Sequence, residues 1–516
     1  MPSEPIVLTI DMGTQSARAL LCDSNGAILA KAQKTYDPPY YSLRPGWAEQ
    51  KPEFYWSSIC ECTRKLKAEY AELWGGVIAV SVSTIRDTFV CLDEHMEPLR
   101  DIIVWLDTRE STQVGVPGWM MTVLKAAGLA EMVKRQRAIS HCNWLAEFEP
   151  ENWRKTAKYA LLSGWLNYKF CGTLADAVAS CVGHLPFSNK RGTWLPKGDM
   201  TRMVFDVSED KQYDVVPSGT VLGSVTAKAA EETGVPVGIP VVATGSDKSC
   251  EILGLGCMNP DQAALSFSTT ATIEITTPVY FEPLPHMPSY NSILPKMYTP
   301  EFEIYRGYWL ISWFKKEFAA LERASALELG VSPESLLNQH LAEVPPGCDG
   351  LMLHPYFTPG LTMPQARGSF IGFADYHTRM HMYRAIVEGI NFSLMEGLRL
   401  IEKKSKTSVQ RLYVAGGGSQ SVEICQITAN QFGLPLFRTH THEVTGLGSS
   451  LVAFVSQGVY RTMEDAVKGM VHYQTEFRPD PAQAALYQKL YNEVFSRIYD
   501  KLQPFYSTIN RILQER

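Results

Sequence analysis

A short polar segment near the start of the chain combines a carboxylate, a glycine, an amide, two hydroxyls and a guanidinium. Its residues are Asp11, Gly13, Thr14, Gln15, Ser16 and Arg18. An acid can hold hydrated Mg²⁺, while hydroxyls and backbone N–H groups can bind phosphate oxygens. Glycine has no Cβ, so the backbone can come close to a phosphate there. The segment has the residue types of a Mg-nucleotide site; the alternative is an ordinary hairpin turn, in which Asp and Gly are also common.

Apolar stretches on either side predict how this segment is held. Residues 6–10 are expected to form a buried strand, and residues 19–23 its return partner. A second pattern of strand, hydroxyl-rich turn and strand spans residues 263–275 and contains Ser268, Thr269 and Thr270. Two such hairpins predict two domains of related architecture, each opening with a turn that faces phosphate.

Two further motifs follow predicted strands. Asp247 comes after an apolar stretch and the turn 244–246, where it could act as a general base or cap the next helix. Gly416, Gly417 and Gly418, followed by Gln420, lie between a strand at 411–415 and a helix reaching residue 432. Glycines at such a junction let a nucleotide lie against the backbone, although a tight turn has the same composition. The spacing is not the GxGxxG of a dinucleotide-binding fold.

Composition bounds the class of protein. The chain has 516 residues, 45% hydrophobic and 20% charged, so at least two globular cores are expected. A net charge of −6 argues against a general nucleic-acid surface, and no apolar run is long enough to predict a membrane span. The N-terminus lacks signal-peptide features, and the eleven cysteines show no metal-like CxxC pairing. We therefore expect reduced thiols in a cytoplasmic protein without nucleic-acid or membrane partners.

Periodicity predicts the elements that position these motifs. Strands are expected at residues 77–82 and 102–105, besides those flanking the two hairpin turns. Helical patterns cover residues 53–71, 117–136, 378–404 and 481–516, with Thr378 as the N-cap of the third. Residues 280–305 are rich in Pro and Tyr and are expected to form an irregular surface excursion.

Together, these motifs resemble those of the FGGY carbohydrate kinases, which are xylulokinase- and glycerol kinase-like members of the actin/hexokinase-like ATPase superfamily. The likeness runs along almost the whole chain and includes further landmarks at residues 46–50, 366–368, 377–379 and 443–450. It implies an α/β fold of two ribonuclease-H-like (actin-like ATPase) domains with an inter-domain cleft. Residues 1–250 would form the N-terminal domain, with the sugar site and first phosphate loop. Residues 251–516 would form the C-terminal domain, with the second phosphate loop, the adenosine site and a C-terminal helix.

The resemblance also assigns roles to single residues. Asp247 matches the family's catalytic base and would share Mg²⁺ with Asp11 as a metal-site residue. The first phosphate loop would bind ATP together with Thr269 and Thr270, and the loop 416–418 with Gln420 would bind its adenosine part. The sugar would contact Asp247 and four further residues. These are Arg86, Asp87, Trp105 and Lys248.

The function implied is transfer of the γ-phosphoryl group of ATP, with Mg²⁺, to a hydroxyl of a small sugar. A ketopentose such as xylulose or ribulose is the first expectation. The pair Arg86-Asp87 resembles a glycerol-kinase feature that reads a diol, so glycerol or a tetritol is the alternative acceptor. A non-catalytic nucleotide-binding regulator on the same fold is the alternative of a different class. Family members are often dimers or tetramers, so a homodimer is expected by analogy.

Overall fold

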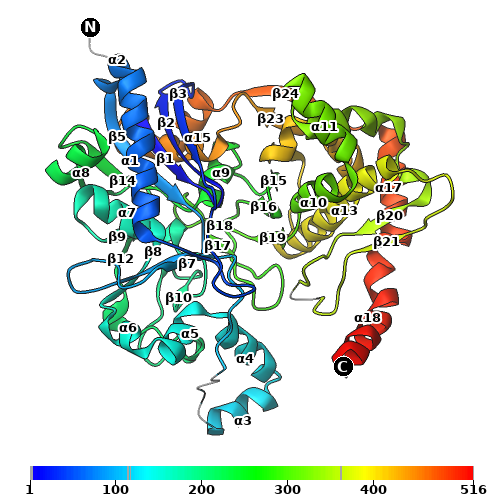
Figure 1. Cartoon of the computed structure of the whole chain (residues 1–516), viewed down its shortest axis with the longest axis horizontal. Helices are drawn as coiled ribbons and strands as arrows, with labels where there is room; N and C mark the ends of the chain where they lie inside the picture. The colour runs from blue at the N-terminus through cyan, green and yellow to red at the C-terminus, as the bar shows by residue number, and fades with distance from the viewer. Residues whose placement is uncertain (1–3, 113–115, 117, 361–362, 515–516) are drawn as a thin grey trace. The chain divides into compact units, whose positions relative to one another are not determined.

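The computed structural model describes residues 4–112, 116, 118–360 and 363–514. The chain forms two compact units (Figure 1). Unit 1 contains residues 1–254, 290–296 and 443–471, and unit 2 contains residues 255–289, 297–442 and 472–516. The predicted division at residue 250 lies near the first crossing between the units. The chain then returns to unit 1 twice, so each unit is discontinuous in sequence.

Unit 1 is built on a six-stranded mixed sheet with the order β13-β14-β5-β1-β2-β3. Strands β1, β5 and β14 run parallel, and the other neighbours are antiparallel. The central strands are buried on both faces, as their near-continuous apolar sequence requires. The strands of this sheet are β1 (Ile6–Met12), β2 (Ser16–Asp23), β3 (Ile28–Thr35), β5 (Val77–Thr84), β13 (Val221–Ser224) and β14 (Pro240–Ala243).

Helices cover both faces of this sheet. Helices α1 (Pro52–Glu69) and α7 (Leu162–Cys171) pack on one face, while α15 (Val444–Ser456) packs on β1 and β5 from the other. Helix α15 also crosses α9 (Asp247–Gly254) at very short range. A Cβ on Gly254 or Gly448 would overlap the backbone of the opposite helix, so glycine permits this approach. The crossing fixes the start of α9, which is Asp247.

Unit 2 repeats the same sheet pattern with the order β19-β16-β15-β22-β23-β24. Strands β15, β22 and β23 run parallel, and the remaining neighbours are antiparallel. Helix α13 (Arg379–Ser405) packs on β16 and β19, and α14 (Val422–Phe432) packs beside it. The strands are β15 (Gln262–Phe267), β16 (Ala271–Ile275), β19 (Glu301–Ile304), β22 (Arg411–Ala415), β23 (Leu436–Thr439) and β24 (Tyr473–Phe477).

Most predicted elements are confirmed, and some differ in part. The pattern at 481–516 forms two helices, Pro481–Glu493 and Ile498–Gln514, and residues 515–516 lie outside the described residues. The pattern at 117–136 forms two helices, broken at Gly128, whose positive φ ends the first helix; residue 117 lies outside the described residues. Residues 280–305 were expected to be irregular, which is wrong in part: β19 is an edge strand of the unit 2 sheet, and residues 290–296 belong to unit 1. The strand at 301–304 was not predicted because an edge strand needs no continuous apolar run, and this segment mixes aromatic and charged residues.

The remaining elements surround these two sheets. A small sheet in unit 1 has the order β4-β7-β6-β8. The other unit 1 elements are β4 (Glu49–Gln50), α2 (Ala71–Trp74), β6 (Phe89–Leu92), β7 (Ile102–Ile103), α3 (Gly118–Ala126), α4 (Ala130–Ile139), α5 (His141–Phe148), α6 (Pro150–Lys155), β8 (Lys158–Leu161), β9 (Ala175–Ala177), β10 (Phe187–Ser188), β11 (Thr193–Trp194), β12 (Asp214–Val216), α8 (Ala227–Thr233), β17 (Tyr290–Asn291) and α16 (Met463–Met470). The other unit 2 elements are β18 (Tyr298–Thr299), α10 (Trp309–Phe318), α11 (Ala320–Leu329), α12 (Pro333–Gln339), β20 (Met352–His354), β21 (Ser369–Ile371), α17 (Pro481–Glu493) and α18 (Ile498–Gln514).

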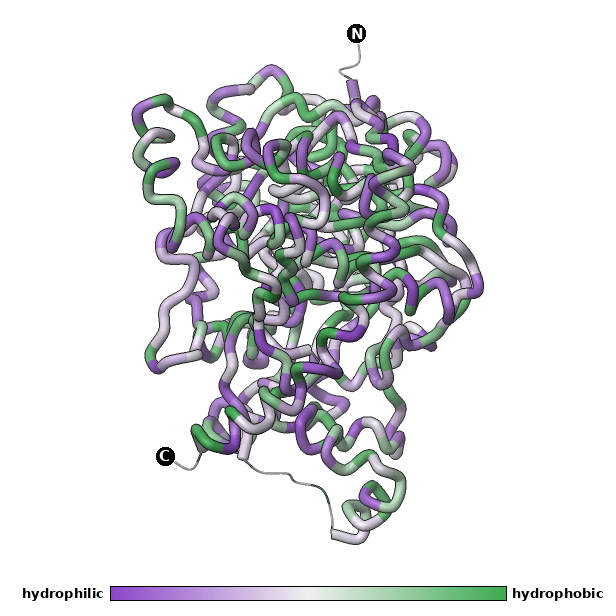
Figure 2. The backbone as a smooth tube through the Cα atoms, turned by 90° about the vertical axis from the view of Figure 1, so that its right-hand side faces the viewer, coloured by the Kyte–Doolittle hydropathy of each residue, from purple (hydrophilic) through white to green (hydrophobic). Residues whose placement is uncertain are grey.

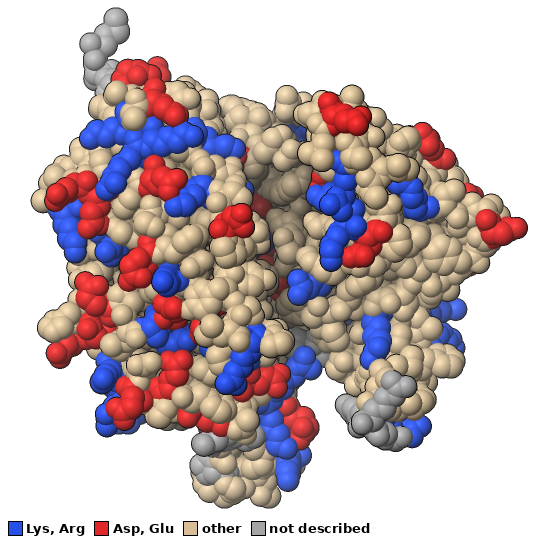
Figure 3. All heavy atoms as spheres, in the orientation of Figure 1, with Lys and Arg blue, Asp and Glu red and all other residues tan. Residues whose placement is uncertain are grey.

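Neither apolar nor charged residues are concentrated in one part of the described chain (Figure 2, Figure 3). Hydrophobic and hydrophilic residues alternate in short stretches (Figure 2), and no helix in the described part of the chain is long and apolar enough to cross a membrane. On the face shown in Figure 3, basic and acidic side chains are interspersed over both units. On that face, therefore, neither acidic nor basic side chains form one continuous patch.

Candidate functional site

The polar turn between β1 and β2 is shaped by its own backbone and one ion pair. The N–H of Gly13 donates to the carbonyl of Ser16 over 3.0 Å, which closes the turn. Asp11 and Arg18 face each other across the two strands, and Arg18 Nη1 lies 2.9 Å from Asp11 Oδ2. Gln15 is exposed at the tip of the turn. The turn therefore presents a carboxylate, a hydroxyl and an amide at the carboxyl end of β1.

Asp11 is a buried carboxylate with an unusual titration. Burial raises its pKa to about 6; the Arg18 guanidinium opposes this shift, while the nearby carboxylates of Asp247 and Glu443 add to it. Glu443 also binds Lys31, with 2.7 Å between Oε1 and Nζ. Two carboxylates that raise each other's cost of ionisation attract a cation, because a cation relieves that cost.

Asp247 begins α9 directly after β14 and its following turn. Its Oδ1 accepts a hydrogen bond from the N–H of Lys248 at 2.8 Å. Burial raises the pKa of Asp247, whereas the positive charges of Arg86 and Lys248 pull it down. Lys248 Nζ itself lies 3.0 Å from Glu251 Oε1. The carboxylate of Asp247 thus lies near two cations and near Asp11.

A loop that begins at residue 178 supports the turn before Asp247. The carbonyl of Ala179 accepts hydrogen bonds from the N–H of Ser246 at 3.3 Å and from Ser249 Oγ at 3.0 Å. A Cβ on Gly245 would lie only 3.2 Å from the Cβ of Ala179, so this turn has little room for a side chain. The position of Asp247 is therefore fixed by neighbours on both sides.

The predicted pair Arg86-Asp87 follows β5, the strand between β1 and β14. The Arg86 guanidinium lies over the ring of Tyr290, 5.6 Å from its centroid. Asp87 binds His184 through both of its carboxylate oxygens. Its Oδ1 accepts from the backbone N–H of His184 at 2.8 Å, and its Oδ2 lies 2.7 Å from His184 Nδ1. Burial alone would raise the pKa of Asp87, but the histidine outweighs it and the pKa is lowered. Burial alone would lower the pKa of His184, but Asp87 raises it.

Trp105 connects this region to the polar turn. Its Nε1–H donates to Thr14 Oγ1 at 3.0 Å, and its backbone N–H donates to Thr88 Oγ1 at 3.3 Å. Trp105 lies in the loop after β7, which ends at Ile103 and so is shorter than the predicted strand 102–105. The ring is half-buried, which leaves part of its surface available to a ligand.

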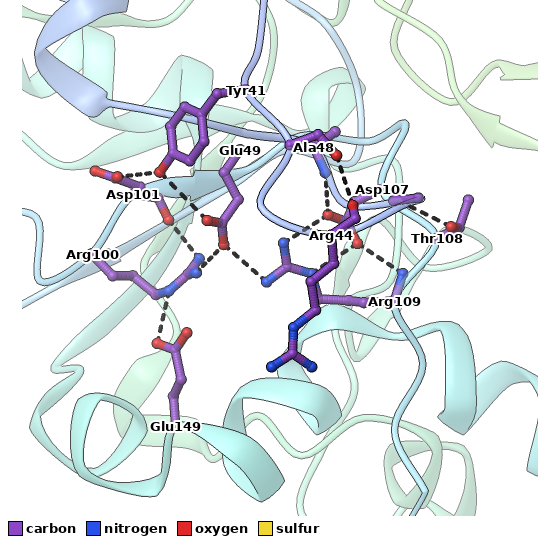
Figure 4. Close-up of polar contacts among 12 residues, drawn as sticks. Tyr41, Arg44, Ala48, Glu49, Arg100, Asp101, Asp107, Thr108, Arg109 and Glu149 are labelled. Carbon is purple, nitrogen blue, oxygen red and sulfur yellow. Dashed lines mark hydrogen bonds and ion pairs between the residues drawn. The ribbon is translucent and has the colours of Figure 1, made fainter.

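A buried ion network orders the loop that carries Trp105 (Figure 4). The Asp107 carboxylate accepts from Arg109 Nε at 2.8 Å and Nη2 at 2.7 Å, and Arg109 Nη1 donates to Glu49 at 2.9 Å. The Arg109 guanidinium also stacks on the rings of Trp47 and Trp144. These contacts order the loop from within the protein, so Asp107 and Arg109 hold Trp105 in place.

In unit 2, the turn between β15 and β16 contains the predicted hydroxyls but no acid. The carbonyls of Ser268 and Thr269 accept from the N–H groups of Tyr308 and Trp309 at 3.1 and 3.2 Å. Thr269 is exposed, while Thr270 is buried and its Oγ1 donates to the carbonyl of Tyr305 at 3.4 Å. The start of α10 therefore holds this turn in place.

The glycine run at 416–418 lies beside that turn. A Cβ on Gly416, which has a φ of 87°, would come within 2.7 Å of the Phe267 backbone, and one on Gly418 would overlap the Tyr308 ring. Gly417 has nothing within 4 Å of a Cβ, and both Gly417 and Gln420 are exposed. Glycine is thus required for packing at two positions, while the middle position is open toward a ligand.

The predicted residues therefore gather into two sets, one in each unit. We call Asp11, Arg86, Asp87, Trp105 and Asp247 the unit 1 cluster; Asp11, Arg86 and Asp247 lie at or just after the carboxyl ends of adjacent parallel strands β1, β5 and β14. We call the turns 268–270 and 416–418 the unit 2 cluster; they follow the parallel strands β15 and β22. Ligands of open α/β sheets bind at such strand ends.

Sequence reasoning missed three residues that join or adjoin the unit 1 cluster. They are His184, which binds Asp87, and Tyr290, which lies under the Arg86 guanidinium. The third is His141, whose pKa is lowered mainly by burial and is also affected by the charges of Asp87 and His184. Each lies in a different segment, and no local spacing connects them to Arg86-Asp87. The only signal was a lone histidine beside a glycine, which is too common a pattern to predict a site.

The donor set of unit 1 fits Mg²⁺. Mg²⁺ is usually held by one or two carboxylates and several waters, and Asp11 and Asp247 supply two electrostatically coupled carboxylates. Within the described residues, no group of three or more His, Cys, Asp or Glu side chains forms a metal-binding cage. The arrangement therefore resembles a metal site completed by water and a phosphorylated ligand rather than an all-protein one.

Two family models together match most of the chain. The N-terminal domain of the FGGY family of carbohydrate kinases matches residues 6–254, and the C-terminal domain of that family matches residues 263–457.

Individual relatives agree with this match. A xylulose kinase of Lactococcus lactis is 27% identical over 504 residues, covering 96% of each chain. An autoinducer-2 kinase of Klebsiella pneumoniae is 28% identical over 501 residues, covering 94% of this chain and 92% of that protein. Among solved structures, a xylulose kinase from Rhodospirillum rubrum superposes with a TM-score of 0.81 at 25% identity, covering 97% of this chain and all of that one.

Proposed function

The chain belongs to the FGGY family of carbohydrate kinases and is thus a sugar kinase, and from this premise we propose that it transfers the γ-phosphoryl group of ATP to a hydroxyl of a ketopentose such as xylulose. One observation carries the proposal: Asp11, Arg86 and Asp247 lie together at the carboxyl ends of three adjacent parallel strands. This placement brings together the proposed metal carboxylate Asp11, the proposed base Asp247 and the cation Arg86 in unit 1.

Asp247 is proposed as the general base. A sugar hydroxyl is a weak nucleophile, so a carboxylate that takes its proton as the oxygen–phosphorus bond forms lowers the barrier. The raised pKa of Asp247 supports this role, because a base titrating nearer to neutral pH binds the departing proton more strongly. Arg86 favours the ionised form of the carboxylate, since its positive charge opposes the effect of burial on the pKa of Asp247.

The polar turn and the unit 2 cluster are proposed to bind ATP. The turn with Gly13, Thr14, Gln15, Ser16 and Arg18 would steady phosphate oxygens through N–H and hydroxyl groups. In unit 2, Thr269 and Thr270 would do the same, while the open backbone at Gly417 and the exposed Gln420 would accept the adenosine part. Mg²⁺, held by Asp11 and Asp247, would supply positive charge against the phosphates.

The acceptor site is proposed to use Arg86, Asp87, Trp105 and Lys248. The Trp105 ring offers an apolar face for the carbon side of a sugar, and its bond to Thr14 ties that face to the phosphate turn. Xylulose kinases that align over 96% of this chain favour a ketopentose. Glycerol or a tetritol is the second candidate, favoured by the adjacent donor and acceptor of Arg86-Asp87.

The proposal extends to the surroundings in which the enzyme works. Within the described part of the chain all eleven cysteines are free, and most are buried with raised pKa values. Free thiols persist in a reducing compartment, so we include a cytoplasmic location in the proposal.

The test is ADP release with ATP and Mg²⁺ against xylulose, ribulose, ribitol, erythritol and glycerol, with Asp247→Ala as the control. We expect xylulose to raise ADP release well above the background without sugar, and Asp247→Ala to silence that response. Preference for glycerol would move the assignment to the polyol candidate. ADP release that no acceptor stimulates would contradict the proposed function.

A further inference from the structure

His184 and Asp87 form a pair that two unusual backbone conformations hold in place. Asp87 has a φ of 49°, and Gly183, next to His184, has a φ of 130°. A Cβ on Gly183 would overlap the Asp87 side chain and its Cα, so glycine is required for the two segments to meet. Positive φ in a residue other than glycine is uncommon and costs free energy. The fold maintains this contact against that cost, which suggests a use for it.

The contact fixes one nitrogen of the imidazole and leaves the other available. Asp87 Oδ2 lies 2.7 Å from Nδ1, and Oδ1 accepts from the His184 N–H, so Nδ1 carries a proton and the ring cannot rotate freely. Among the described residues no hydrogen-bond partner of Nε2 is found, and a quarter of the side chain is exposed. Nε2 is therefore an oriented polar atom that a ligand can reach.

The structural ion pair of Arg109 with Asp107, in the same unit, differs from the His184–Asp87 pair in its exposure and in its use of polar atoms. In the pair of Arg109 with Asp107, both side chains are at most 1% exposed, and Arg109 Nε, Nη1 and Nη2 all donate to carboxylates. Every polar atom of that guanidinium is used inside the protein. His184 has the same kind of partner but keeps one nitrogen unused and accessible, which is typical of a ligand contact.

Three connections place His184 at the acceptor site. Arg86, beside Asp87 in sequence, acts electrostatically on Asp247. Thr88, on the other side of Asp87, holds the backbone of Trp105. The loop leading to His184 contains Ala179, whose carbonyl holds the turn before Asp247. Segments that flank the His184–Asp87 pair in sequence thus contact Trp105 and the turn before Asp247, and they carry the cation Arg86.

We propose that His184 is a specificity-determining residue whose Nε2 hydrogen-bonds one hydroxyl of the sugar acceptor, while Asp87 acts as a positioning residue that holds Nδ1. A hydroxyl can both donate and accept, so it suits an imidazole in either charge state. The inference rests on the proposed function and deepens it. It assigns Asp87 a role through His184 in addition to any direct sugar contact.

The experiment uses two variants that each keep one half of the imidazole's bonding. His184→Asn retains an amide near the position of Nδ1 and loses Nε2, whereas His184→Gln places an amide near the position of Nε2. Steady-state kinetics are measured for D-xylulose and its 1-deoxy, 3-deoxy and 4-deoxy analogues, with His95→Asn, an exposed histidine, as the matched control. Thermal unfolding of each variant checks that it is folded.

We expect His184→Asn to lower kcat/KM for D-xylulose by about 10- to 100-fold, because a hydrogen bond to a buried polar partner is lost. The KM for ATP stays unchanged, and His184→Gln recovers part of the loss. One deoxy analogue, the one lacking the contacted hydroxyl, is used equally well by wild type and His184→Asn. A structural role would instead lower activity toward all analogues alike.

Equal losses on every analogue, or a kcat/KM within about twofold of wild type, would overturn the inference while leaving the kinase assignment intact. Failure of the wild type to phosphorylate any acceptor would overturn the proposed function, and the inference with it. If His184→Asn does not fold, the ¹⁵N resonance of His184 Nε2 in the wild type provides the readout. It should shift on addition of D-xylulose, and an unchanged resonance at saturating sugar would overturn the inference.

Discussion

The two hairpin turns, one in each unit, occupy the same place in sheets of the same pattern but differ in charge. At the end of the first hairpin Asp11 faces Arg18, and the two form an ion pair. At the corresponding position of the second hairpin Ser266 faces Thr272. Across each sheet, the first strand of the hairpin is flanked by two strands parallel to it and then by an antiparallel edge strand. In unit 2 these are β22, β23 and β24.

The difference shows how one scaffold is used for two tasks. The charged turn neighbours Asp247 and Arg86, so unit 1 holds the groups that could move a proton and attract a cation. The neutral turn neighbours the glycine run 416–418, so unit 2 offers hydroxyls and open backbone, which suit phosphate and a planar base. Duplicated topology therefore does not imply duplicated chemistry.

The largest expected effect lies on the charged side. Asp247→Asn should lower kcat by about 10²- to 10⁴-fold, because the amide cannot accept the proton of the sugar hydroxyl. Binding of ATP, measured by calorimetry, should stay within about threefold of wild type. Asp214→Asn, at an exposed acid in the same unit, is the control and should be silent. Near-normal turnover of Asp247→Asn would remove Asp247 as the base.

A matched pair tests the comparison itself. Asp11→Asn should lower kcat/KM for MgATP by about 10²-fold, because one of two coupled carboxylates near the metal is lost. Ser266→Ala, at the corresponding position in unit 2, should change it by less than about threefold. The measurement is steady-state kinetics over a range of Mg²⁺ concentrations. If the two variants were equally impaired, the two turns would not differ in task.

The glycine run separates packing from binding. Gly417→Ala should raise the KM for ATP by about tenfold without changing Tm, since its methyl meets open space in the protein but obstructs a nucleotide lying on the backbone. Gly418→Ala should lower the free energy of unfolding by about 1–3 kcal/mol, because the methyl overlaps the Tyr308 ring. A normal KM for ATP in Gly417→Ala would place the adenosine elsewhere.

The smallest effect concerns pH. Asp247 must be ionised to act as a base, and its pKa is raised, so activity is lost as the pH falls through that raised value. We expect the acidic decline of kcat/KM for the sugar to begin at a higher pH than the pKa of an ordinary aspartate, about 3.9, would give. The pH–rate profile measures this, and an acidic decline centred at or below about 3.9 would contradict the raised pKa.

Local patterns predicted the scaffold well because they reflect the periodicity of buried elements. Strands β1, β15 and β22 coincide with apolar runs of the sequence. Helix α13 begins after its N-cap Thr378, as expected. The discontinuity of the units was missed, since residues 290–296 and 443–471 return to unit 1 through contacts that no local pattern encodes.

The candidate site divides in the same way. Residues within one turn, such as Asp11 and Gly13, are visible in sequence because their spacing is short. The pairing of Asp87 with His184 joins residues 97 positions apart, so only the fold brings it into view. The bond between Trp105 and Thr14, 91 positions apart, was hidden for the same reason.

The most direct test of the account is the product itself, followed by ³¹P NMR in a mixture of the protein, ATP, Mg²⁺ and D-xylulose. We expect a sugar phosphate ester to appear in equal amount to ADP, and Asp247→Asn to form both about 10²- to 10⁴-fold more slowly. Inorganic phosphate accumulating without a sugar ester, or ester formed by Asp247→Asn at nearly the wild-type rate, would contradict the proposed function.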